Sequence, residues 1–502
     1  MDATTLSLGH TGKTELDVEG PPTPLMRAIE KWHELLTPRM LAEIRQCAVM
    51  LSKMPVPVGT AFSGCDIVTV LLGEMFAYWE TLFGVKIELR HCFCCDNDED
   101  RQGFLREMFP DCEALVSDVR GLLKSPATSI MDPTQERVVP LCKVLLFTAG
   151  FICKARSRLN SNASANKGCV QRETESTGVS FRETWEYVKQ HRPRVVLLEN
   201  VVALAEPVPD SAMTDAEYIV DRFLELGYAC TVLRCDAWSY GSLARRERLY
   251  WMAFESNNPE AGAKVQEVLD ICATGEPICD LDSYLIDEDC RQSHAKEPKE
   301  DAEREFKYKD EHIEAYDEAK LTWPPLRGKW NGSLDHLGQR AYELTVYCDA
   351  RWPYVPRPTG THWEYIDANF SMKRLVGPSP TSPWSDAMPT MTGLGQYIAR
   401  RGVPLAEVGS QNHSIAGNME LAIEMRHLDG IELMQIVGFD LSYMQGRLPE
   451  SEVATSMAGN AFSAFGIGPL MLGVFRSLTW AGEGGDRDDD GHMACGSRSP
   501  TI

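Results

Sequence analysis

Short apolar runs alternate with helical patterns from residue 58 to residue 254, and this alternation restricts the possible folds more than any other feature of the chain. In α/β proteins, helices and buried strands follow one another in this way because each helix crosses over between two parallel strands. We therefore predict an α/β fold with a doubly wound, mostly parallel sheet. The predicted strands span residues 58–62, 85–94, 141–148, 194–198, 228–234 and 248–254, and the predicted helices span 67–83, 98–109, 181–190 and 215–226.

Composition divides the remainder of the 502 residues. Periodic apolar residues before the first strand predict a helical segment that Pro38 interrupts. Residues 281–320 carry many charges, which is typical of a solvated insertion, and the Pro- and Trp-rich stretch after them predicts a smaller irregular domain. Helical patterning returns at 429–439 and 461–478. The expected boundaries are 1–23 for a disordered leader, 24–57 for the helical segment, 58–258 for the main domain, 259–424 for the insertion and irregular domain, 425–480 for a return to the main domain, and 481–502 for a disordered tail.

The net charge of −23 argues against a uniformly basic nucleic-acid-binding protein. A local basic groove is still compatible with this charge, because cations cluster between Lys154 and Arg172 and again between Arg245 and Arg248. The sequence contains no run of 18 or more apolar residues, so it predicts no membrane span. The first residues do not have the pattern of a secretory signal, so the 16 cysteines indicate free thiols in a reducing compartment.

Cys153 lies three residues beyond Gly150, where a buried apolar run ends. Open α/β sheets carry their chemistry at the carboxyl ends of their strands, so this cysteine is a candidate nucleophile. The cations that follow it, Lys154, Arg156 and Arg158, are expected to favour the reactive thiolate. The alternative is that a small apolar cysteine simply ends a core strand.

Other polar residues follow the remaining strands. Gly64 in the first strand-to-helix turn would let a cofactor approach the backbone, and Asp96 after the second strand is placed to accept hydrogen bonds from ribose hydroxyls. Glu199 could remain protonated at a buried strand end and donate that proton. Arg246 and Arg248, two residues apart, would share a face suited to phosphate or carbonyl oxygen. The alternatives are an ordinary tight turn, a helix-capping acid and a surface arginine cluster.

His91, Cys92, Cys94 and Cys95 are potential zinc ligands on the second predicted strand. Successive side chains of a strand point to opposite faces, so regular structure cannot bring all four together. No second Cys/His pair follows at the spacing of a zinc finger. We therefore predict no metal site from these four residues.

Taken in order, these stretches resemble the cytosine-C5 DNA methyltransferases that use S-adenosylmethionine. The resemblance covers about residues 58–255 and 425–475 and is specific in the order of its motifs rather than in any one of them. The motifs are Phe62-Ser-Gly-Cys65, Asp96 with Asp98, Asp118-Val119, Gly150-Phe-Ile-Cys153 with Ser157, Glu199-Asn-Val201, Arg245-Arg-Glu-Arg248, Arg426-His-Leu428 with Gln435-Ile-Val-Gly-Phe-Asp440, and Gly459-Asn-Ala461.

The resemblance implies a Rossmann-like class I methyltransferase sheet with a smaller, irregular target-recognition domain. It also implies a mechanism in which Cys153 attacks a flipped-out cytosine and a mobile loop at 158–172 closes over the base. The implied catalytic residues are Cys153, Glu199, Arg246 and Arg248. The implied S-adenosylmethionine site contains Phe62, Ser63, Gly64, Asp96, Asn97, Asp118 and Asn460. The implied DNA contacts are Lys154, Arg156, Ser157 and Arg158.

Three positions depart from the family pattern. Asp66 replaces the second glycine of the first motif, Ile152 replaces the proline before the nucleophile, and Ala244 replaces a glutamine. Two alternatives to DNA methylation therefore remain open: the same chemistry on tRNA, and a catalytically impaired fold that only binds nucleic acid or a partner. A nuclear location is expected from the resemblance alone, with the cytoplasm as the alternative.

Overall fold

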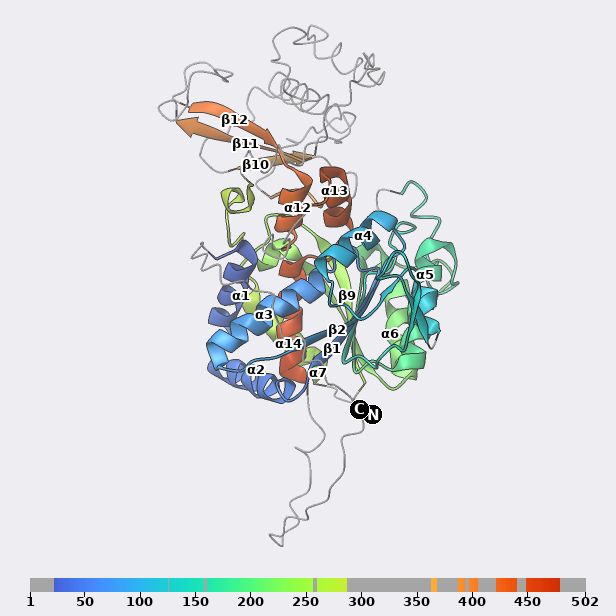
Figure 1. Cartoon of the computed structure of the whole chain (residues 1–502). Helices are drawn as coiled ribbons and strands as arrows, with labels where there is room; N and C mark the ends of the chain where they lie inside the picture. The colour runs from blue at the N-terminus through green and yellow to red at the C-terminus, as the bar shows by residue number, and fades with distance from the viewer. Residues whose placement is uncertain are drawn as a thin grey trace.

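A computed structural model of the chain describes residues 22–124, 126–157, 160–255, 260–286, 363–367, 387–392, 397–404, 421–439 and 448–478. Figure 1 shows a wide sheet flanked by helices, with a small second sheet at one end of the molecule. The expected leader up to residue 21, the charge-rich stretch from 287 to 320 and the tail lie outside the described residues.

The main sheet has seven strands in the order β3-β2-β1-β6-β7-β9-β8. All neighbouring pairs are parallel except those of β9, which is antiparallel to both β7 and β8. This arrangement confirms the predicted doubly wound, mostly parallel sheet. The strands are β1 (Val56–Ala61), β2 (Leu89–Cys95), β3 (Leu115–Val116), β6 (Leu146–Ala149), β7 (Val195–Val201), β8 (Ala229–Asp236) and β9 (Glu247–Phe254), and a separate hairpin pairs β4 (Ala127–Ser129) with β5 (Arg137–Val139).

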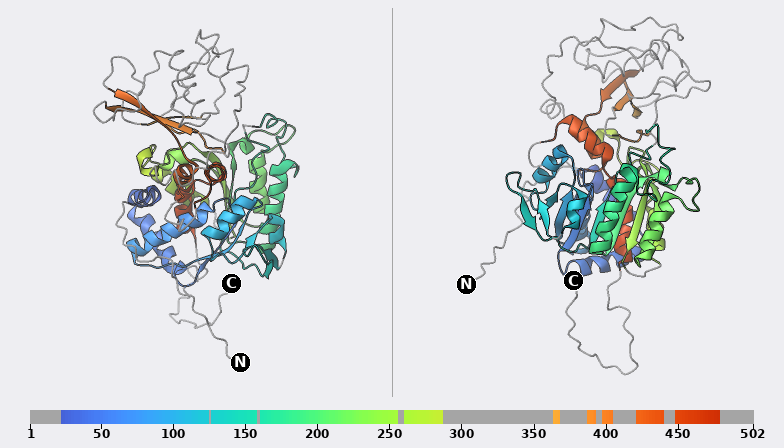
Figure 2. Two further views of the ribbon diagram at one scale, coloured as in Figure 1. Left: turned by 45° about the horizontal axis from the view of Figure 1, so that its top comes forward. Right: turned by 90° about the vertical axis from the view of Figure 1, so that its right-hand side faces the viewer.

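Helices cover both faces of the sheet (Figure 2). Two apolar cores, one on each face, hold them in place. Successive side chains of β7 point to opposite faces of the sheet and so contribute to both cores: Val195 and Leu197 belong to one, and Val196 and Leu198 to the other. The first core includes side chains from α1 (Pro24–Leu35), α2 (Pro38–Leu51), α3 (Ile67–Phe83), α4 (Glu99–Met108), α7 (Ala261–Cys272), α12 (Gly430–Ile436), α13 (Ser451–Asn460) and α14 (Ala464–Ser477). The second core lies beneath α5 (Glu175–His191) and α6 (Asp215–Glu225).

The chain leaves the main domain and returns to it through α14, whose residues are all buried. Gly468 allows α14 to approach α1, because a Cβ at this position would lie 2.1 Å from the Trp32 ring. Arg476 near the end of α14 pairs with Glu267 of α7 at 2.6 Å. Helix α7 is therefore part of the main core, so this core extends beyond the expected boundary at residue 258.

A three-stranded antiparallel sheet forms the described part of the expected smaller domain. It consists of β10 (Glu364–Asp367), β11 (Tyr397–Pro404) and β12 (Leu421–His427) and stands beyond α12 and α13 in Figure 1. Strand β12 crosses the expected boundary at residue 424. Within the described residues, no single helix has the length and apolar character to cross a membrane, although α13 and α14 together meet these criteria across a 43° bend.

Candidate active site

The carboxyl ends of the central strands β6 and β7 meet the start of β9. We call this side of the sheet, where the parallel strands end, the sheet edge. The pairing of Val201 with Arg248 places the arginine beside the end of β7, and its Nε atom lies 3.0 Å from Oε1 of Glu199. A Cβ at Gly150 would lie 3.5 Å from the other carboxylate oxygen of Glu199. The structure therefore brings the ends of three predicted motifs into contact.

Cys153 begins a tight turn in the loop after β6. The amides of Arg156 and Ser157 both donate to the Cys153 carbonyl, at 3.0 and 2.9 Å. The cysteine is partly exposed, whereas Phe151, two residues before it, is buried. The loop thus presents Cys153 at the sheet edge while Phe151 anchors it in the core.

Three side chains that the sequence did not single out fasten this loop. Asn200 donates through Nδ2 to the Phe151 carbonyl at 2.7 Å. Ser180 and Thr177, both on α5, accept hydrogen bonds from the amides of Ile152 and Ala155 at 3.1 and 3.2 Å. Only Asn200 had a sequence signal, as the middle residue of Glu199-Asn-Val201.

The departure at Ile152 has a structural counterpart. Proline fixes φ but has no N–H, whereas the Ile152 amide donates to the Ser180 hydroxyl at 3.1 Å. In this chain a hydrogen bond restrains the residue before the nucleophile, in place of a ring.

The environment of Cys153 differs from the sequence expectation. Burial and the charge of Glu199 raise the pKa of the Cys153 thiol, and Arg248 and Arg246 only partly oppose them. The cations that follow the cysteine contribute little, because Lys154 is exposed and Arg156 turns inward. For Lys154 and Arg156 the structure therefore gives no sign of the expected stabilisation of the thiolate, whereas Arg158 lies outside the described residues.

Arg156 was predicted to contact DNA, but its side chain is buried, with an exposed fraction of 1%. It donates to the carbonyls of Ala163 and Ala203 and pairs with Glu206 at 3.0 Å. In this arrangement it holds the loop after Cys153 together and is withdrawn from any phosphate.

The other predicted DNA contacts divide by position. Lys154 is exposed and Ser157 is partly buried in the turn, whereas Arg158 lies outside the described residues. Further along, the amides of Gly168 and Gln171 donate to the buried carboxylate of Asp215 at 3.0 and 3.2 Å. The far end of the predicted mobile loop is thus anchored to α6.

The two predicted catalytic arginines have different surroundings. Arg248 faces Glu199, whereas Arg246 is buried and donates to the carbonyls of Gly459 and Ala461. Burial and the neighbouring Arg248 lower the pKa of Arg246 to about 10. Arg246 therefore fastens the Gly459-Asn-Ala461 motif to the sheet edge, while the charge of Glu199 still acts on it.

The cofactor residues predicted on β1 and β2 form one hydrogen-bonded turn. Ser63 exchanges two hydrogen bonds with Cys95, and the Gly64 amide donates to Oδ2 of Asp96 at 2.9 Å. Phe62 is left-handed at φ 54°, a strained conformation of the kind that concentrates at functional sites. A Cβ at Gly64 would meet nothing within 4 Å, so the turn is open to a ligand and fits a small cofactor.

The remaining predicted cofactor residues are less closely joined. Asn97 is exposed, and Asn460 donates to the Ser456 carbonyl at the end of α13. Asp118 pairs with Arg120 at 2.7 Å, which lowers the pKa of its carboxyl. A cavity of about 360 Å³ contains Asp118 but none of the other predicted cofactor residues; it is lined by Val116, Ser117, Asp118, Arg120, Gly121, Lys124 and Thr128.

The departure at Asp66 creates a buried ion pair beneath the cofactor turn. Oδ2 of Asp66 accepts a hydrogen bond from Thr60 at 3.0 Å and lies 3.0 Å from Nε2 of His91. Burial alone would lower the pKa of His91, but Asp66 raises it to about 10. The carboxylate thus points into the protein, and the space around Gly64 stays clear.

Ala244, the third departure, joins the main domain to a later segment. It is buried and forms a strand-like bridge with Met388. The flanking amides complete the bridge, since Arg245 donates to the Met388 carbonyl at 2.9 Å and Met388 to that of Leu243 at 3.0 Å.

The sequence matches one known protein family over most of its length. The model of the C-5 cytosine-specific DNA methylase family matches residues 90–467. A DNA (cytosine-5-)-methyltransferase, DMT5 of Cryptococcus neoformans, is 25% identical over 238 residues, which are 47% of this chain but only 9% of that protein.

Two solved structures are similar at low identity. They are a methyltransferase of Entamoeba histolytica, with 13% identity and a TM-score of 0.45, and the Dnmt2 methyltransferase of S. pombe, with 12% identity and a TM-score of 0.42. Each comparison covers 85% of this chain and 100% of the other. The family match spans most of the chain, and it includes Cys153, Glu199 and Arg248; the chain therefore belongs to the C-5 cytosine-specific DNA methylase family.

Proposed function

We propose that this protein transfers a methyl group from S-adenosylmethionine to C5 of a flipped-out cytosine in DNA. The observation that carries the proposal is the meeting of Cys153, Glu199 and Arg248 at one sheet edge. Membership of the family supplies the reaction class, and these three side chains supply the groups that the reaction needs.

Cys153 is the proposed nucleophile. Cytosine C5 is a weak nucleophile by itself, and attack of a thiolate on C6 gives C5 the character of an enamine. The new Cys153–C6 bond breaks again after methylation, when a base removes the C5 proton and the sulfur leaves. Since burial raises the pKa of this thiol, its proton has to be lost before or during the attack.

Glu199 and Arg248 are proposed to hold the pyrimidine. Cytosine presents its N3 atom next to its O2 carbonyl oxygen, and the pair presents a carboxyl group next to a guanidinium, with 3.0 Å between the nearest atoms. Glu199, once it has taken up a proton, would donate it to N3 and so drain the charge that develops as sulfur attacks C6. Arg248 would donate to O2 and hold the ring in place.

The cofactor is proposed to lie against the turn between β1 and α3, which is hydrogen-bonded to the end of β2. The residues proposed to hold it are Phe62, Ser63, Gly64 and Asp96. The space beside Gly64 is open to a ligand, and hydrogen bonds to Cys95 and Asp96 fix the turn in place. Asn97, Asp118 and Asn460 remain proposed contacts on the resemblance alone. S-adenosylmethionine supplies an electrophilic methyl group when it is bound.

DNA is proposed to approach the edge that Cys153 occupies. A base within a duplex has to leave the stack before C6 can reach the thiol. Lys154, exposed beside the nucleophile, and Ser157 are the described residues proposed to meet the backbone. The small sheet of β10, β11 and β12 stands at the same end of the molecule and is the proposed target-reading element (Figure 1).

The test is methyl transfer from labelled S-adenosylmethionine to duplex DNA and to tRNA, with wild type beside Cys153→Ser. We expect label at cytosine C5 in DNA and none with the variant. Label in tRNA alone would establish the alternative substrate. A folded wild-type protein that labels neither substrate, but still binds nucleic acid, would replace the proposal with a binding module.

A further inference from the structure

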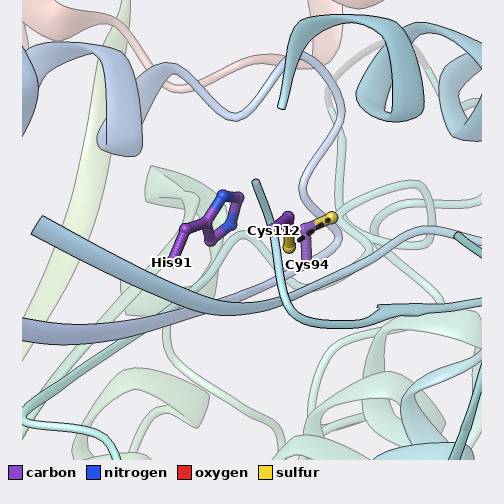
Figure 3. A group of neighbouring side chains, drawn as sticks. All are labelled: His91, Cys94 and Cys112. Atoms are coloured by element: carbon purple, nitrogen blue, oxygen red, sulfur yellow. Dashed lines mark hydrogen bonds between the residues drawn. The ribbon is translucent and has the colours of Figure 1, made fainter. Parts of the chain in front are cut away.

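A second cluster of chemically active side chains lies beneath the cofactor turn. His91 and Cys94 project from β2, and Cys112 comes from the segment between α4 and β3 (Figure 3). All three are buried, and their ligand atoms lie within 4.8 Å of one another. No step of the proposed methyl transfer uses them.

An irregularity in β2 explains why these residues converge. Val58 pairs with His91 but Gly59 pairs with Phe93, so Cys92 is an extra residue in the strand. Cys94 packs in the core on the α3 side of the sheet, whereas Cys92 and Cys95 pack in the opposite core. The four residues considered from the sequence therefore do not converge, but the bulge leaves His91 and Cys94 on one face, where Cys112 meets them.

The geometry suits a tetrahedral, sulfur-binding ion. The Sγ atoms of Cys94 and Cys112 are 3.7 Å apart. Two thiolates bound to one Zn²⁺ at about 2.3 Å, separated by a tetrahedral angle, are also about 3.7 Å apart. Nε2 of His91 faces Asp66 at 3.0 Å, and Nδ1 is buried without a hydrogen-bond partner of its own. A carboxylate that orients a metal-binding imidazole in this way is the usual companion of a histidine ligand.

We propose that His91, Cys94 and Cys112 bind one Zn²⁺ ion, through Nδ1 and two thiolates, with Asp66 orienting the imidazole. A solvent molecule takes the fourth position, as at other zinc sites with three protein ligands. The ion joins β2 to the segment that enters β3. It also fixes Asp66, two residues after Gly64, and so stiffens the cofactor turn from below.

Binding releases the protons that these ligand atoms carry, because sulfur coordinates zinc as thiolate and Nδ1 coordinates it only when that nitrogen is unprotonated.

The test measures metal in the full chain, purified without oxygen. We expect about one zinc ion per protein by elemental analysis. We expect Co²⁺ added to the zinc-depleted protein to give a tetrahedral spectrum with thiolate charge-transfer bands. Cys112→Ser should weaken zinc binding by about 100-fold or more. Cys92→Ser is the matched control, because this buried cysteine of the same strand faces the other core.

Three results would overturn the proposal. One is a wild-type protein that takes up neither zinc nor cobalt. Another is zinc that survives Cys112→Ser but leaves with Cys92→Ser, which would place it at the neighbouring group of Cys92, Glu113 and Cys142. The third is a disulfide between Cys94 and Cys112 in the oxygen-free preparation. The cobalt spectrum needs no variant, so it decides the matter even where Cys112→Ser does not fold.

Discussion

The active-site edge has two halves: the nucleophile half around Cys153, Glu199 and Arg248, and the cofactor half around the Phe62–Asp66 turn. Each accommodates its departure from the family pattern by a different means. Beside the nucleophile, the partly exposed Ile152 donates a neutral hydrogen bond from its amide to the buried Ser180 hydroxyl. Beneath the cofactor turn, Asp66 is a buried charge that depends on His91. Loss of a neutral hydrogen bond costs about 1 kcal/mol, whereas an unpaired buried charge costs about 3–5 kcal/mol. Changes at Ile152 should therefore cost little folding stability, whereas changes at Asp66 should cost much more.

The largest effect is expected on the rate of methyl transfer when Glu199, in the nucleophile half, is changed. Glu199→Gln should lower the rate constant of methyl transfer by about 10²–10⁴-fold, because an amide cannot deliver a proton to N3. Single-turnover kinetics measure this, with binding of S-adenosylmethionine as the check that the cofactor half is intact. Glu186→Gln, on the exposed surface of α5, is the control. A loss smaller than tenfold would remove Glu199 from its proposed role.

A comparable effect on stability is expected from the cofactor half. Asp66→Asn leaves His91 buried without its charged partner, so the free energy of unfolding should fall by about 3–5 kcal/mol. Urea denaturation in the presence of a chelator measures this without a metal contribution. Asp98→Asn is the matched control, because Asp98 caps α4 from an exposed position and asparagine caps helices about as well, so this change should cost less than about 1 kcal/mol. Equal losses for the two variants would contradict the contrast between the two halves.

A smaller effect is expected in the reactivity of Cys153. Because the pKa of Cys153 is raised, its thiol form prevails near neutral pH. As the pH rises toward that pKa, the rate of alkylation should increase about tenfold for each pH unit, because only the thiolate reacts. Iodoacetamide labelling followed by peptide mass spectrometry measures the rate at this one cysteine. A rate that is already constant between neutral and mildly acidic pH would show that the free protein holds a thiolate.

The smallest effect is expected at the Ile152–Ser180 hydrogen bond. Ile152→Pro removes the donor and Ser180→Ala the acceptor, and each should cost about 1 kcal/mol of unfolding free energy. Because the two changes remove the same bond, the double variant should be little worse than either single one. A double-mutant cycle tests this, and fully additive losses would show that the bond contributes nothing.

The periodicity of the sequence predicted most of the main fold. The helix expected at 67–83 runs from Ile67 to Phe83, and all six expected strands are present with shifted ends. The two-residue strand β3 and the helix α13 were missed. The reversal of β9 could not be predicted either, because alternation of apolar residues carries no information on strand direction.

The site was predictable where a residue's place on a strand end decides its neighbours. Cys153, Glu199 and Arg248 meet for this reason. The sequence could not show that Arg156 and Arg246 turn inward, because the carbonyls that they bind, such as those of Ala203 and Gly459, belong to distant loops. The convergence of Cys112 on β2 depends on a bulge, which the sequence pattern does not reveal.

Covalent trapping on DNA that contains 5-fluorocytosine tests the role of Cys153 most directly. Fluorine at C5 cannot be removed as a proton is, so the bond between sulfur and C6 should persist after methyl transfer. We predict an adduct that survives denaturation, requires S-adenosylmethionine and maps to the peptide bearing Cys153. An adduct that still forms with Cys153→Ala, or a wild-type protein that methylates DNA without forming one, would contradict the account.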